Sequence, residues 1–232
     1  MTAKLPEWAE PVARYMLEHG LTGTLKIAGV ALLTSTLIGV TLGTLMTIRF
    51  PPTRALIRLY VEVWRGLPII VTLFIVYFGA PAISLRFEMS PIKAGAVTLT
   101  LWGSAQIAEA TRGAVQSISR TQHEAAMALG FGWVGRHLSV ILPQATRRLL
   151  PPLVSLLIGI ILNTTLIGVI GGAELLETGK RMVELVNAPR DFGGFGDRGE
   201  FPIYAGIMLV FFVICFPLTR LSAWLERRLI RA

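Results

Sequence analysis

The sequence is short of charged residues, cysteine and histidine, and each shortage excludes a class of protein. Asp, Glu, Lys and Arg make up only 16% of the 232 residues, whereas soluble domains have about 25%. Cys215 is the single cysteine, so an intrachain disulfide is impossible and a redox site has no support. His19, His123 and His137 stand alone in the sequence, without the spacing of metal ligands, so no metal site is expected.

Sequence signals for nucleotide binding and for secretion are missing as well. Gly179 and Lys180 lack the upstream glycine and the following Ser or Thr of a G-x-x-x-x-G-K-[ST] loop, so this chain is not expected to hydrolyse ATP. Residues 1–20 carry several charges and no apolar core, so we expect no cleaved signal peptide. No polar segment is large enough to fold alone, so residues 1–232 are expected to form one domain.

Hydrophobic residues are abundant at 53% of the chain, and they gather in long uncharged runs. Because a bilayer core about 30 Å thick needs roughly 20 apolar residues per helix, these runs predict membrane spans. Five spans follow, at about residues 27–48, 66–85, 94–110, 149–172 and 201–220. The runs are continuous rather than alternating, which predicts helices and not barrel strands. We therefore expect an all-α membrane protein with five transmembrane helices.

The third of these spans is the least regular. Its uncharged part holds only 15 residues, so the helix must continue through Glu109 and Arg112 toward the headgroups or cross the membrane obliquely. The first span contains Gly39 and Gly43 in a G-x-x-x-G arrangement. This spacing lets two helix backbones approach closely, either within the chain or across a dimer.

The distribution of charge predicts how the spans are oriented. Three alternate zones, 49–65, 109–148 and 220–232, contain 13 Lys and Arg residues against 4 acids. The other three, 1–26, 82–93 and 172–200, contain 9 against 10. Because positive charge is retained in the cytoplasm, we expect the N-terminus outside and the C-terminus inside. The net charge of +8 is thus a signal of topology, and nucleic-acid binding is not expected.

Two segments of the predicted outer face have recognisable patterns. Four apolar residues near the N-terminus recur at helical spacing: Trp8, Val12, Tyr15 and Met16. They fit a short amphipathic helix lying on the outer surface, and a frayed polar tail fits equally well. Segment 174–200 is acidic and rich in glycine, so we expect a flexible loop there.

The cytoplasmic loop, at about residues 113–146, has the most specific pattern of the chain. Residues 124–129 are strong helix formers, and Gly130 can end that helix in the left-handed conformation. Residues 133–139 can form a second short helix before Pro143. A rigid helix, glycine turn and helix unit is suited to docking in the groove of a partner. An ordinary interfacial linker explains the same residues about as well.

The loop resembles the E-A-A-x3-G-x9-I-x-L-P signature of permease subunits of binding-protein-dependent ABC importers, with Val140 in place of the usual Ile. Other segments resemble the polar amino-acid branch of that family, of the histidine, glutamine, glutamate or arginine type. In order along the chain they are 60–68, 77–79, 108–118, 142–145, 150–152, 163–166, 174–175 and 217–228. The resemblance of each segment is modest alone, but together the segments cover about residues 58–228.

The resemblance implies a type I ABC importer permease fold, multi-pass in the bacterial cytoplasmic membrane. Amino acids or similar small polar solutes would be imported by alternating access. ATP and Mg would be bound by a separate cytoplasmic ATPase dimer, and no cofactor by this chain. The other implied partners are a second permease subunit, identical or homologous, and an external solute-binding protein. The residues that match the family's ATPase-coupling motif are Glu124, Ala125, Ala126, Gly130, Leu142 and Pro143.

Three positions depart from the pattern of the polar amino-acid branch. Gln106 stands where Tyr is common, Thr121 where Gly is usual, and Leu162 where a Lys often precedes the Asn-Thr-Thr segment. The last departure places an uncharged residue inside the fourth span, where relatives often have a Lys. The identity of the solute is therefore not carried over from the resemblance.

Polar side chains inside spans are costly in lipid and usually face the protein interior or a water-filled path. Asn163, Thr164 and Thr165 lie in the fourth span and are candidates for the translocation pathway, although hydrogen bonding between helices explains them equally well. Glu62 and Arg65 lie near the inner boundary with the spacing of a helical salt bridge. We interpret this pair first as structural, with gating as the alternative.

Two other classes of function share the hydropathy of this chain. A secondary transporter or channel would work without an ATPase partner, and a membrane scaffold would transport nothing. Five spans with an external N-terminus and a coupling-type loop fit a secondary transporter or channel poorly. A scaffold would be distinguished by the absence of solute-dependent ATPase activity in any complex.

Overall fold

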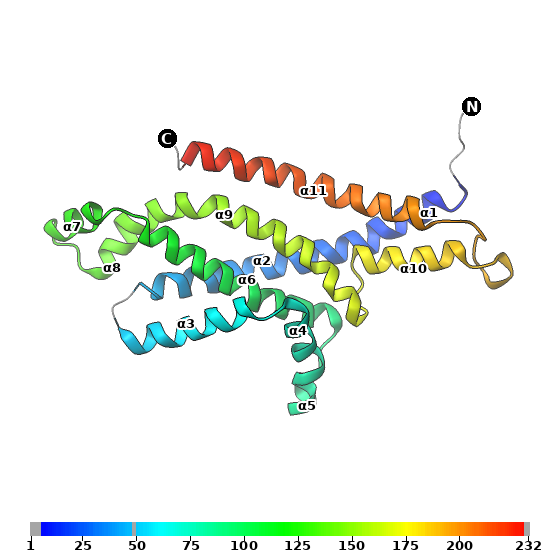
Figure 1. The fold of residues 1–232 in the computed structure, drawn as a ribbon, viewed down its shortest axis with the longest axis horizontal. Helices are drawn as coiled ribbons and strands as arrows, with labels where there is room; N and C mark the ends of the chain where they lie inside the picture. The colour runs from blue at the N-terminus through cyan, green and yellow to red at the C-terminus, as the bar shows by residue number, and fades with distance from the viewer. Residues whose placement is uncertain (1–5, 48–49, 230–232) are drawn as a thin grey trace.

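The computed structural model of the chain describes residues 6–47 and 50–229, and every regular element within them is helical (Figure 1). Three helices are long and apolar enough to cross a membrane, and a bent pair raises the number to four. The fold is therefore an all-helical membrane protein with three to four candidate spans among the described residues. Residue 48, the predicted end of the first span, lies outside them.

The first span is longer at its start than the sequence predicts. Helix α1 (Ala9–Tyr15), the π-helical turn η1 (Met16–Leu21) and α2 (Thr22–Leu45) form one helical run of 37 residues. Trp8, Val12 and Met16 are buried against α10 and α11. The N-terminal segment is thus neither a separate surface helix nor a frayed tail, because these side chains contribute to a core that the sequence alone does not reveal.

The second predicted span is bent. Helix α3 (Pro51–Gly66) is followed by α4 (Ile69–Phe74), η2 (Ile75–Gly79) and α5 (Ala80–Ile83), with an angle of 104° at the break. Pro68 lacks a backbone N–H and stands in an extended conformation at the start of α4, which separates the two helices. A short 3-10 turn, η3 (Leu85–Phe87), leads into the next helix.

Helix α6 (Pro91–Gln116) lies along α2 at the centre of the bundle (Figure 1). A Cβ added at Gly39 of α2 would lie 2.6 Å from Cβ of Ile107, and one at Gly43 would clash with the carbonyl of Ala108. The G-x-x-x-G spacing therefore serves close helix packing, as predicted, and the contact is within the chain.

The helical run that holds the fourth span begins in the cytoplasmic loop. Helix α8 (Trp133–Arg136), η4 (His137–Ile141), α9 (Leu142–Asn163) and η5 (Thr164–Ile170) follow one another without a break, over 38 residues. The expectation of a short helix ending before Pro143 is wrong. The π-helical turn η4 ends at Ile141, two residues before Pro143, and widens the backbone next to the point where the proline lacks a donor.

Segment 174–200 is only partly a loop. Helix α10 (Leu175–Asn187) occupies its first half, followed by η6 (Arg190–Phe192) and then α11 (Glu200–Leu229). The expectation of a flexible loop is wrong for α10, because Leu175, Val183 and Val186 bury one face of that helix. Glycines with positive φ are confined to the second half, at Gly193 and Gly196.

The bundle has two distinct ends (Figure 1). The N-terminal part of the chain, α10 and the start of α11 lie at one end. Helix α7 (Arg120–Ala128) lies at the other end, together with α8 and the C-terminal part of α11. Residues 6–26 and 172–200 thus lie at the end opposite to residues 120–136 and the C-terminal part of α11.

Candidate functional site

The turn after α7 has the backbone conformation that the sequence predicts. Gly130 has φ +82°, and its N–H donates to the carbonyl of Met127 at 2.9 Å. The N–H of Phe131 donates to the carbonyl of Ala126 at 3.0 Å. These two bonds form a Schellman motif, which fixes the direction in which the chain leaves α7. The unit formed by α7, Gly130 and α8 is therefore well defined.

Glu124 stands in the middle of α7 and not at its start, because the helix begins at Arg120. Its carboxylate is therefore not placed to complement the positive end of the helix dipole. Glu124 and Ala125 are exposed, whereas Ala126 is 2% exposed. Glu124 and Ala125 thus face outward, whereas Ala126 is on the buried face of the helix.

The α7–α8 unit exposes large apolar side chains, which we call the loop surface. Its members are Met127, Leu129, Phe131, Val134 and Leu138. Leu129, which precedes the glycine turn, is 78% exposed. Several large apolar side chains exposed on one short polar segment are typical of a site of interaction. The last two predicted coupling residues lie at the start of α9, where Leu142 is half-buried and Pro143 is exposed.

A small core holds the unit to the rest of the bundle. Ile118 and Ile141 pack with residues of α6 and α9, including Ala145 and Leu149. Polar contacts reinforce this core, since Nε2 of Gln144 donates to Oε1 of Gln122 at 3.2 Å. The segments on either side of the unit are therefore anchored to α6 and α9, and the contact between Gln122 and Gln144 joins α7 itself to α9.

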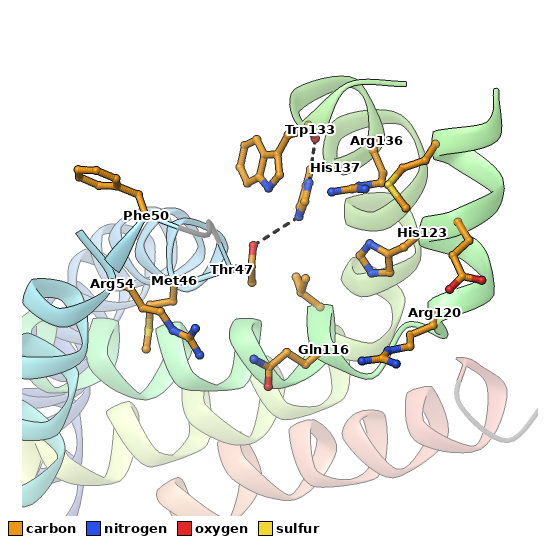
Figure 2. A pocket seen from close by; sticks show the side chains of 13 residues that line it. Met46, Thr47, Phe50, Arg54, Gln116, Arg120, His123, Trp133, Arg136 and His137 are labelled. Carbon is orange, nitrogen blue, oxygen red and sulfur yellow. Dashed lines mark hydrogen bonds between the residues drawn. The ribbon is translucent and has the colours of Figure 1, made fainter. Parts of the chain in front are cut away.

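An open cavity of about 840 Å³ lies between the α7–α8 unit and the end of α2 (Figure 2). The ring of His137 stacks on Trp133 with centroids 4.1 Å apart. Its Nε2 lies 3.4 Å from Oγ1 of Thr47, across the cavity wall. Arg54, Arg120 and Arg136 also line the space. Sequence reasoning missed this cavity, because it treated the arginines only as a topology signal.

Asn163, Thr164 and Thr165 lie where α9 passes into η5. Each side chain donates to a backbone carbonyl of its own helix: Asn163 to Gly159 at 2.7 Å, Thr164 to Ile161 at 2.7 Å and Thr165 to Leu162 at 2.8 Å. Thr164 is fully buried, whereas Asn163 and Thr165 are partly exposed. The hydrogen bonds between helices that were weighed as an alternative do not form at these three residues, all of which the structure describes.

The expected salt bridge between Glu62 and Arg65 is wrong. Glu62 accepts from Nε of Arg58 at 2.7 Å, one helical turn earlier, and this pair is exposed. Nε of Arg65 instead donates to Oε1 of Gln106 on α6 at 3.1 Å. Arg65 is drawn to the neighbouring helix because Gln106 offers an acceptor there, and Gln106 is one of the departures noted from the sequence.

Helix α6 carries a polar pair that spacing arguments overlooked. Nε of Arg112 donates to Oε2 of Glu109 at 2.9 Å, and both side chains are 28% exposed. The two residues line a small cavity of about 210 Å³ with Arg58 and Arg65 of α3. Within residues 6–47 and 50–229, no group of three or more His, Cys, Asp or Glu side chains lies close enough to hold a metal ion.

Comparison with known proteins gives a consistent family. The family described as binding-protein-dependent transport system inner membrane component matches residues 36–231. The probable glutamine ABC transporter permease protein GlnM of Bacillus subtilis is 33% identical over 214 residues, which are 92% of this chain and 93% of that protein. The glutamine transport system permease protein GlnP of Escherichia coli is also 33% identical, with the same coverage.

Solved structures agree with this family. A structure described as an amino acid ABC transporter with histidines has a TM-score of 0.81 at 26% identity. It covers 97% of this chain and 100% of the matched chain. An inward-facing MetNI methionine ABC transporter has a TM-score of 0.75 at 18% identity, which shows the shared fold. The expected family, the amino-acid class and the absence of catalysis in this chain are thereby confirmed. The chain belongs to the permeases of binding-protein-dependent ABC transporters and is the non-catalytic, multi-pass inner-membrane component of an amino-acid importer.

Proposed function

We propose that this permease imports a polar amino acid by alternating access and that the α7–α8 unit receives the movement of a separate ATPase dimer. The single observation that carries the proposal is the loop surface, where apolar side chains are exposed around a glycine turn of fixed geometry. A helix held at a defined angle fits a groove in a partner better than a mobile linker does. ATP and Mg would then be bound by the partner and not by this chain.

The membrane arrangement in this proposal is five spans with the N-terminus outside and the C-terminus inside. Helix α6 is 26 residues long, about 39 Å at 1.5 Å per residue, which is enough to cross the bilayer despite Glu109 and Arg112. The bent α3–α4 pair supplies the second crossing. The segments rich in Lys and Arg gather at the end that holds α7 and α8, which supports a cytoplasmic position for that end.

A second permease subunit, identical or homologous, completes the proposed pathway. Helix α11 buries only 11% of its most apolar window within the chain, and residues such as Phe201, Met208 and Phe212 are exposed. Such a face is available to lipid and to another subunit. An external solute-binding protein would deliver the amino acid to the opposite end, near α10. Two of the compared relatives are named for glutamine, so glutamine is the first solute to test.

Asn163, Thr164 and Thr165 are proposed to contact the pathway when the transporter changes state. Their bonds to their own helix are short-range and exchangeable with a polar solute or its water. Alanine at all three positions should change the affinity for the solute or the transport rate. Unchanged kinetics would assign the segment to packing alone.

Topology and coupling can be tested in one preparation. Cysteine introduced at Ser139 should resist an impermeant thiol reagent in intact cells and react in inside-out vesicles. Vesicles that contain the permease, its ATPase and its binding protein should accumulate radiolabelled glutamine only with ATP. Labelling of position 139 from outside would contradict the orientation, and uptake without ATP would contradict the mechanism.

A further inference from the structure

The cavity beside α7 is strongly basic. Arg54, Arg120 and Arg136 line it together with His123 and His137, and Glu124 is the one acid among its described lining residues. None of the three arginine side chains forms an ion pair or a hydrogen bond with another described residue. Nε of Arg136 is buried without a partner. Because an unpaired buried donor costs free energy, Nε of Arg136 needs an acceptor, and a negatively charged occupant of the cavity would supply one.

The arginines come from separate elements and surround one space (Figure 2). Arg54 belongs to α3, Arg120 to α7 and Arg136 to α8. Burial, followed by the charges of Arg136 and His137, lowers the pKa of His123. The same space therefore disfavours an additional positive charge. A compact anion that reaches several arginines would offset this repulsion.

Apolar side chains line the other part of the cavity. Met46, Phe50, Val115 and Met127 lie beside the basic residues. Met46 directly follows α2, an apolar helix of 24 residues, so this level corresponds to the end of the first span. Trp133 and Phe50 are aromatic residues at that level, as is common at membrane interfaces. A lining that places apolar side chains beside basic ones, as Met46 and Phe50 lie beside Arg54, matches an amphiphile better than a free inorganic anion.

We propose that this cavity binds the phosphate headgroup of an anionic phospholipid of the inner leaflet, with Arg54, Arg120 and Arg136 as its ligands. The proposal rests on the proposed cytoplasmic position of the α7–α8 unit. Arginine pairs phosphate oxygens with two parallel N–H groups, which suits a headgroup held between three helices. Basic pockets between helices on the cytoplasmic side are known to bind such headgroups.

A bound lipid would connect the coupling unit to the first span. Arg120 and Met127 belong to α7, whereas Arg54 and Met46 lie at the junction of α2 and α3. Within the described residues, the polar contact across this gap is the 3.4 Å approach of Thr47 and His137. A phosphate between the arginines would strengthen that connection. Coupling of ATP hydrolysis to transport should therefore depend on anionic lipid.

The test uses the complete permease and ATPase complex in nanodiscs of phosphatidylcholine with increasing phosphatidylglycerol. Native mass spectrometry counts the phosphatidylglycerol molecules retained by the wild type and by the R54Q/R120Q/R136Q variant. We expect roughly fivefold weaker retention for each neutralised arginine. The matched control is Arg147→Gln, an exposed arginine of α9 at the same end and outside the cavity lining. It should retain the lipid as the wild type does, and the corresponding triple lysine variant should recover part of the binding.

Several outcomes would overturn the proposal. Equal retention in the wild type and the triple glutamine variant would show that the lipid binds elsewhere. Displacement of phosphatidylglycerol by millimolar inorganic phosphate would assign the cavity to a soluble phosphate. Loss of ATPase-subunit binding in the triple variant, with lipid retention unchanged, would assign the cavity to the protein partner.

A second measurement uses only the wild-type complex and does not depend on variants that fold. Diethyl pyrocarbonate modifies exposed histidines, and mass spectrometry identifies the modified positions. Phosphatidylglycerol should protect the half-buried His123 severalfold relative to phosphatidylcholine alone, while the exposed His19, which follows α1 at the opposite end, stays reactive. Equal reactivity in both lipids would contradict lipid binding. The label at position 139 reports orientation separately, so failure of one proposal is distinguishable from failure of the other.

Discussion

The two ends of this molecule are built differently. At the α10 end, Trp8, Met16, Val186 and Ile203 close a core between α1, α10 and α11. The buried carboxylate of Glu174 accepts from two backbone N–H groups there. At the α7 end, apolar side chains are exposed, and the side chains of three arginines have no partner within residues 6–47 and 50–229. The first end closes a core within this chain, whereas the second leaves apolar and basic side chains open to other molecules.

Two glycines make the contrast testable. A Cβ on Gly23, near the α10 end, would clash with the backbone carbonyl of Ala173, which has no flexible atoms to move. A Cβ on Gly130 would meet no atom within 4 Å, although φ is +82°. Valine at Gly23 should therefore impair folding, whereas valine at Gly130 should leave the fold intact and misplace α7 relative to a partner.

The largest effect is expected from Gly23→Val. Overpacking against backbone should destabilise the chain by about 3 kcal/mol and reduce the amount of protein that reaches the membrane. Thermal unfolding and fluorescence-detected gel filtration measure both quantities. Gly29→Val is the matched control in α2, because a Cβ there has open space. A wild-type unfolding temperature for Gly23→Val would mean that the α10 end is less tightly packed than the structure indicates.

Gly130→Val should leave insertion and oligomeric assembly intact but lower solute-stimulated ATP hydrolysis about tenfold. The left-handed conformation costs a β-branched residue about 1 to 2 kcal/mol, which displaces α7 from its docking angle. Gly132→Ser is the control, since its φ of −66° suits any residue and a Cβ there has open space. Full coupling in Gly130→Val would show that this turn does not transmit movement.

The same contrast explains what the sequence could and could not predict. The glycine turn after α7 and the close contact at Gly39 depend on local backbone and spacing, so they were predictable. The helix α10 and the bend at Pro68 were not, because burial of Val186 and the break between two apolar segments are tertiary effects. The predicted pairing of Glu62 with Arg65 also failed, since the spacing equally allows Arg58, one turn before Glu62, and Arg58 is the partner that the structure shows. The basic cavity joins residues from three elements and leaves no local pattern.

Glu124→Ala should have a smaller effect than Gly130→Val. The carboxylate is exposed in mid-helix, and within the described residues it forms no ion pair. Its removal should therefore leave the unfolding temperature unchanged. If Glu124 meets the ATPase subunit, binding of that subunit should weaken roughly two- to fivefold, as for other charges at an interface rim. Sedimentation or surface plasmon resonance with purified ATPase measures this change, and wild-type affinity would remove Glu124 from the docking surface.

The smallest expected effect is a pH dependence of stability that arises from Glu174 at the α10 end. Burial raises the pKa of Glu174, and the N–H groups of Leu176 and Glu177 oppose that shift without cancelling it. The folded pKa thus lies above the unfolded value of about 4.3. The folded state therefore binds more protons between these two pKa values, so wild-type stability should be highest below the unfolded pKa and fall as pH rises through the folded pKa.

Glu174→Gln should remove this pH dependence. Glutamine resembles the protonated acid, so the variant should match the wild type at low pH and unfold at a slightly higher temperature above the folded pKa. Glu184→Gln, an exposed position of the same helix, is the control and should follow the wild-type curve. The measurement is the unfolding temperature of the purified complex across mildly acidic to neutral pH. Parallel curves for Glu174→Gln and the wild type would mean that the carboxylate is solvated in the native protein, and that the α10 end is not closed.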